Sequence, residues 1–156
     1  MVPAEFTLDK FHRVIQHSFG WSNYHLYSFN PKGLLSSPSF TYPLQDADYE
    51  TISTRTTKVG ALFQVESDQF TYTYDFGDHW EHQITLEKIF YEAANHATLI
   101  AGRGKCPPED CGGIGGYQNF LETLRNPKDP DYKSMRTWAG LKKAKKWEPE
   151  EFNLEE

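Results

Sequence analysis

The feature that most constrains the fold is a pair of segments in which apolar and polar residues alternate. Aromatic residues alternate with threonines over 70–74, apolar and polar residues alternate over 80–86, and residues 76–79 connect the two segments. Because successive side chains of a strand point to opposite faces, this pattern predicts a β-hairpin. His82 shares the register of Trp80, so we expect its side chain to face the interior.

A helix is predicted before this hairpin, over residues 7–19. Thr7 can cap its N-terminus, and Gly20 follows as a stop signal. One apolar stripe runs along it, formed by Leu8, Phe11, Val14, Ile15 and Phe19. The helix is therefore expected to bury this stripe.

The remaining elements complete an α+β fold. Strands are expected at 24–29, near 39–42 and near 51–54, one helical turn at 58–63, and helices around 117–124 and from Asp129 as N-cap to Trp138. We predict an antiparallel sheet built around a central hairpin and packed by an N-terminal helix and two C-terminal helices. Residues 1–156 are expected to form a single domain.

Composition narrows the class of protein. The formal net charge is −6, which argues against a chain whose main task is to cover nucleic-acid phosphates. Only two cysteines occur, which is consistent with a reducing compartment, and no apolar run is long enough for a membrane span. The sequence therefore predicts a cytoplasmic protein that does not bind membranes.

Acidic and imidazole side chains are concentrated at the hairpin connection. Asp75, Asp78, His79, Glu81 and His82 lie within eight residues. They suit a divalent metal or proton transfer. They also fit a structural role. Gly77 and Asp78 would then form the turn, Asp75 would accept hydrogen bonds from backbone N–H groups, and His82 would be a hydrogen-bonded core histidine.

A second group of candidate ligands lies in the loop Cys106–Gly113. Cys106 and Cys111 are spaced as two zinc ligands, but a closed zinc site needs four. His79, His82 and His96 are the candidates for the remaining two positions if the loop folds over the hairpin. The alternative is that the prolines hold the loop and that the cysteines are small buried apolar residues.

Two further motifs have a functional and a structural interpretation. Glycines at 112, 113, 115 and 116 precede a predicted helix, where backbone amides can hold an anion or tight turns can require glycine. The lysine run 142–146 beside Trp147 suits phosphate contact and base stacking, and it equally suits a solvated helix end.

Several motifs in order resemble one family. They are Phe19-Gly-Trp21 followed by His25, Tyr74 to His82, Cys106 to Gly113, and Gly116-Tyr117. Together they are similar to the plasmid pRiA4b ORF-3-like family, over nearly the whole chain. The resemblance implies an uncharacterised α+β group found in bacteria, archaea and mobile elements. It also implies a strand before Val2, and a further cysteine where this chain has Thr98-Leu-Ile; both are missing here.

We predict a binding or interaction domain without catalysis of its own. Its ligand, macromolecular or small, is not specified by the sequence. The predicted surface joins the hairpin connection to the cysteine loop and consists of Asp75, Asp78, His79, Glu81, His82, Glu109 and Asp110. The alternative is a metal-dependent hydrolase, acting on nucleic acid, in which Asp75, Asp78, His79 and His82 hold the metal and a bound water attacks.

Overall fold

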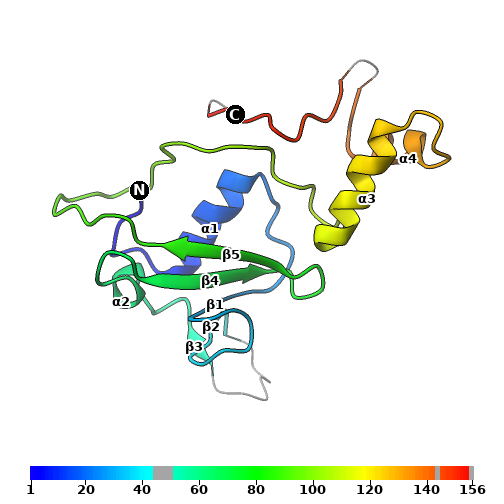
Figure 1. Ribbon diagram of the computed structural model, residues 1–156. Coiled ribbons are helices and arrows are strands. Elements are labelled where there is room, and N and C mark those ends of the chain that lie inside the picture. Colours follow the sequence, from blue (N-terminus) through cyan, green and yellow to red (C-terminus); the bar gives the residue numbers. More distant parts are fainter. Residues whose placement is uncertain (44–50, 143–144, 155–156) are drawn as a thin grey trace. The chain divides into compact units, whose positions relative to one another are not determined.

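The structure, a computed structural model, describes residues 1–43, 51–142 and 145–154 (Figure 1). The chain divides into two compact units, Met1–Ile100 and Ala101–Glu156. The first unit contains the sheet and two helices, and the second contains two helices.

The sheet of the first unit has five strands in the order β3-β2-β1-β4-β5. Their bounds are Tyr27–Asn30 for β1, Phe40–Thr41 for β2, Ile52–Ser53 for β3, Gln69–Tyr74 for β4 and Trp80–Thr85 for β5. All neighbouring pairs are antiparallel except β2 and β3, which are parallel. The predicted α+β class and hairpin are confirmed, and β4 and β5 supply the two longest strands.

Strand β1 begins three residues later than the sequence predicts. The backbone N–H groups of Tyr24 and His25 donate to the hydroxyl of Tyr74, at 3.0 and 3.3 Å, instead of joining the sheet. The segment before Tyr27 is therefore fixed by a side chain of β4, a long-range contact that local sequence patterns do not reveal.

Helix α1, Leu8–Phe19, begins and ends as predicted. The Thr7 hydroxyl accepts the N–H of Lys10, and Gly20 adopts a left-handed conformation with φ of 72°. Its buried face differs from the predicted stripe, because Leu8 and Phe11 are buried together with the polar residues His12 and Gln16. Val14, Ile15 and Phe19 are only half-buried. The polar pair is tolerated because both side chains bond to the hydroxyl of Tyr72, within the sheet.

Aromatic rings form most of the core of the first unit. Phe29, Tyr72 and Tyr74 are fully buried, and Phe11 stacks on Phe29 with ring centroids 5.8 Å apart. Such ring pairs add about 0.5–1.5 kcal/mol each beyond the area that they bury. The short helix α2, Val59–Leu62, adds two buried aliphatic residues, and it confirms the single helical turn predicted there.

In the second unit, α3 spans Gly113–Arg125 and α4 spans Tyr132–Trp138. Helix α3 begins earlier than predicted, so Gly113, Gly115 and Gly116 lie in its first turn and Gly112 is its N-cap. Helix α4 begins later than the predicted cap at Asp129, because the carboxylate and carbonyl of Asp129 accept the N–H groups of Asp131 and Tyr132 in a separate turn. No helix in the described ranges is long and apolar enough to cross a membrane.

Candidate functional site

The hairpin turn is organised by one carboxylate. Tyr74 pairs with Trp80, which leaves residues 75–79 as the connection. Asp75 has a φ of 54°, and its Oδ1 accepts the N–H groups of Gly77 and Asp78 at 2.9 and 3.2 Å. The role in which Asp75 satisfies backbone N–H groups is therefore confirmed. Asp78 is half-buried within this turn.

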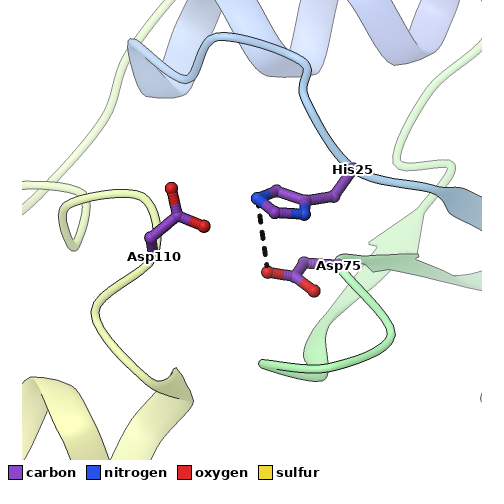
Figure 2. A group of neighbouring side chains, drawn as sticks. All are labelled: His25, Asp75 and Asp110. Carbon is purple, nitrogen blue, oxygen red and sulfur yellow. Dashed lines mark ion pairs between the residues drawn. The ribbon is translucent and has the colours of Figure 1, made fainter.

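The second oxygen of Asp75 faces an imidazole. Nε2 of His25 lies 3.7 Å from Oδ2 of Asp75, and the side chains are 30% and 13% exposed (Figure 2). The His25 ring packs edge-on against Tyr74, with centroids 5.8 Å apart. His25 is not among the site residues predicted from the sequence, although it belongs to one of the motifs on which the resemblance to a family rests. The pairing could not be predicted because 50 residues separate His25 from Asp75 in the sequence.

A more exposed pair lies at the tip of the hairpin. Nε2 of His79 is 3.4 Å from Oε1 of Glu81, and both side chains are about half exposed. The same Glu81 oxygen accepts the backbone N–H of Leu34, at 3.1 Å. Glu81 thereby fixes a loop that follows β1 and holds the carboxylate beside the imidazole. These side chains form a polar, accessible surface.

His82 faces inward, as its register predicts. Its ring lies 5.0–5.7 Å from the rings of Phe19, Trp21 and Tyr72, measured between centroids. Burial lowers the pKa of His82, and backbone groups of Tyr72 and Trp80 offset this only in part. Its Nδ1 is buried and has no hydrogen-bond partner among the described residues. The imidazole is therefore neutral near pH 7.

The cysteine loop belongs to the second unit. Both cysteines are free thiols, and burial raises the pKa of Cys106 to about 12, with Cys111 and Glu109 adding to the rise. The Cys111 sulfur lies 3.8 Å from the carbonyl oxygen of Gly113. Asp110 is exposed and has a φ of 60°. A buried thiol with a raised pKa is protonated near pH 7 and is a poor nucleophile.

A pocket of about 350 Å³ adjoins this loop within the second unit. Its lining combines carboxylates with apolar and small residues: Asp110, Cys111, Gly116, Asn119, Phe120, Asp131, Ser134, Met135 and Trp138. Its volume is within the usual range for small-ligand sites. The predicted zinc ligands His79 and His82 belong to the first unit and Cys106 and Cys111 to the second, and their joint site stays a prediction.

The first unit has an α+β fold in which the hairpin strand β5 lies at the edge of the sheet, and the comparisons with known proteins agree with this class. The chain matches the Plasmid pRiA4b ORF-3-like protein family over residues 1–156, and it belongs to that family. It is 34% identical over 142 residues to the uncharacterized protein y4hQ of Sinorhizobium fredii, covering 90% of this chain and 71% of that protein.

A solved structure is similar over almost the full chain. The crystal structure of the protein of unknown function MM3350 from Methanosarcina mazei Go1 gives a TM-score of 0.79 at 29% identity. The similarity covers 99% of this chain and 84% of that one. Neither relative is described with an activity or a ligand, so the comparisons define the family and the fold.

Proposed function

We propose that this chain is a binding module of its family, without catalysis of its own, and that the hairpin connection is its recognition surface. The observation that carries the proposal is that the Asp75 carboxylate stabilises the hairpin turn. One of its oxygens accepts two backbone N–H groups and the other faces His25. A turn fixed in this way holds His79 and Glu81 in a defined arrangement, which favours selective contact with a partner.

The geometry of the first unit supports this proposal over hydrolysis. A metal-dependent hydrolase would need Asp75, Asp78, His79 and His82 to converge on one ion. Among the described residues of this unit, no three of these four side chains offer ligand atoms within 4.8 Å of one another. His82 instead lies among aromatic rings, where burial favours its neutral form.

The proposed surface extends to Asp78, Glu109 and Asp110, with a macromolecular or small-molecule ligand. Glu109 and Asp110 lie on the cysteine loop, where Asp110 is exposed. A cytoplasmic location is part of the proposal, because two free thiols suit a reducing compartment. The acidic character of these residues favours a cationic partner over nucleic acid.

The test compares two exposed histidines. His79 belongs to the proposed surface, whereas His96 is exposed outside the hairpin and contacts Asn95. The chain is immobilised and incubated with lysate of its native cells, and captured molecules are identified by mass spectrometry. We expect the wild type and H96A to retain the same partner and H79A to lose it, with unchanged circular dichroism. Equal retention by H79A would contradict the proposed surface.

The metal-dependent hydrolase remains a second candidate because His25 and Asp75 form a carboxylate–imidazole pair. These groups suit zinc or manganese. Metal content after purification without added metal and turnover of bis(p-nitrophenyl) phosphate distinguish the candidates. We expect no stoichiometric metal and no turnover above the buffer blank. Turnover that D75N abolishes while the fold persists would overturn the binding proposal in favour of catalysis.

A further inference from the structure

A second pocket in the second unit has a different chemical character. Its volume is about 480 Å³, and it lies between the C-terminal half of α3, helix α4 and the segment 146–149. Apolar, aromatic and charged side chains line it: Leu121, Leu124, Arg125, Pro127, Tyr132, Arg136, Lys146, Trp147, Glu148 and Pro149. The volume is in the range of pockets that hold small organic ligands.

The lining is basic although the chain as a whole is acidic. Three cationic residues, Arg125, Arg136 and Lys146, line the pocket together with one carboxylate, Glu148, which leaves two positive charges in excess. The formal net charge of the whole chain is −6, so the net charge of the pocket lining is opposite in sign to that of the chain. A concave site with excess positive charge attracts anions and repels cations.

Two of these cations are available to a ligand. In the part of the chain that the structure describes, Arg125 and Lys146 have no ion-pair or hydrogen-bond partner for their side chains. Arg136 is held differently, because its guanidinium donates to the carbonyls of Lys142 and Lys145, at 2.9 and 3.0 Å. Arg136 therefore fixes one wall of the pocket, and Arg125 and Lys146 can meet an anion.

Aromatic side chains provide flat apolar walls beside these charges. The Trp147 indole N–H donates to the Tyr117 hydroxyl at 3.2 Å, and the Trp147 ring packs edge-to-face with Phe120. Tyr132 lies under the guanidinium of Arg136, with 5.6 Å between that group and the ring centroid. Both rings are thus held in place before any ligand arrives, which lowers the entropic cost of stacking on them.

We propose that this pocket binds a nucleoside monophosphate, either free or as the terminal nucleotide of a single strand. The phosphate would lie against Arg125 and Lys146, and the base would pack against the aromatic and proline walls. A phosphate monoester carries about −1.5 to −2 charges at pH 7, which matches the excess positive charge of the lining. Arginine and lysine both bind phosphate, and aromatic rings can stack on any of the bases.

The pocket also gives a specific location to one part of the lysine run 142–146. Lys146 lines the pocket beside Trp147, whereas Lys142 and Lys145 contribute their carbonyl oxygens to Arg136. Residues 143–144 lie outside the described ranges. Binding one nucleotide requires positive charge only in the pocket. An acidic chain can therefore bind one phosphate group although it does not bind along a nucleic-acid backbone.

The experiment titrates the full chain with defined probes and follows the indole N–H signals of its four tryptophans by NMR. The W147F variant assigns the Trp147 signal. The probes are AMP, adenosine, inorganic phosphate and a 5′-phosphorylated hexanucleotide. We expect AMP to shift the Trp147 signal in a saturable way and to bind at least about tenfold more tightly than adenosine or phosphate alone. Binding of the hexanucleotide tighter than that of AMP would identify a strand terminus as the source.

Two charge-removing variants test the pocket against a matched control. R125Q and K146Q should each weaken AMP binding about tenfold, the loss typical of one charge-assisted hydrogen bond. K133Q removes a positive charge from an exposed residue of α4 that does not line the pocket, and it should leave the affinity within about twofold. Absence of a saturable Trp147 shift with either nucleotide probe, or equal weakening by K133Q, would overturn the proposal. Equal affinity for phosphate and AMP would also overturn it.

Discussion

The imidazole of His12 lies flat on the ring of Tyr27, with centroids 3.6 Å apart and planes within 4° of parallel. Its Nε2–H donates to Oδ1 of Asn23, at 2.5 Å, and its Nδ1 accepts the hydroxyl of Tyr72, at 2.7 Å. The side chain of Gln16 donates to the same hydroxyl. This network uses the neutral imidazole, because the Tyr72 hydroxyl that donates to Nδ1 would have to turn its hydrogen away if Nδ1 were protonated.

Stability should therefore fall with pH below about 6.5. Burial lowers the pKa of His12 from 6.5 to about 4, while Asn23 and Asp9 oppose the shift. Below pH 6.5 the unfolded chain binds a proton that the folded chain excludes, so stability is lost until pH 4 is reached. The loss attributable to His12 is about 3 kcal/mol. Urea unfolding at intervals between pH 7.5 and 4 measures it.

The matched variant is H12Q, which can keep polar contacts but does not titrate. Carboxylates elsewhere contribute to acid unfolding in both proteins, so the difference between their pH profiles reports His12. We expect the profile of H12Q to be flatter between pH 6.5 and 4. Parallel profiles for the two proteins would show that His12 is not the group responsible.

Asp75 should tolerate loss of its charge better than loss of its side-chain oxygen. D75N retains an acceptor for the N–H groups of Gly77 and Asp78, and asparagine accepts a left-handed φ of 54°. D75A removes the acceptor and should cost about 1–3 kcal/mol of unfolding free energy, measured with urea. Equal losses in both variants would show that the ion pair with His25 matters more than the turn.

The elements defined by local chemistry could be predicted from the sequence. The cap at Thr7 and the stop at Gly20 set the ends of α1 because both act through neighbouring backbone groups. The start of β1 could not be predicted, since it depends on Tyr74, 50 residues from Tyr24. The same reason explains why His12 was missed as a core residue, as its burial requires a hydroxyl from β4.

The sequence predicted which residues lie near the hairpin connection better than it predicted how they contact one another. The density of acidic and imidazole groups in the hairpin made Asp75 and His79 candidates, and the alternation along the strand predicted correctly that His82 faces inward. The partner of Asp75 was not predicted, because His25 lies in a segment without strand pairing. The basic pocket of the second unit was not predicted as a cavity, because concavity depends on how α3 and α4 pack.

Two neighbouring glycines of α3 should respond oppositely to alanine. A Cβ at Gly116 would lie 1.8 Å from the carbonyl oxygen of Cys111, whereas a Cβ at Gly115 meets nothing within 4 Å. G116A should destabilise the second unit by about 1–3 kcal/mol, and G115A should stabilise it by about 0.5–1 kcal/mol. Hydrogen exchange of the α3 amides measures both. Similar protection in the two variants would show that the cysteine loop does not approach the helix so closely.

Cys106 should react slowly with iodoacetamide in the folded chain. Burial raises the pKa of its thiol from 9.0 to about 12, so the thiolate fraction at pH 8 falls on the order of a thousandfold. In a C111S background, which leaves one thiol to count, mass spectrometry should show alkylation at least about a hundredfold slower than in urea. Fast alkylation of the folded chain would mean that the thiolate is stabilised there. In the chain that keeps Cys111, a Cys106 alkylation rate that rises on adding EDTA would show that a metal ion had protected the sulfur, as the predicted zinc site requires.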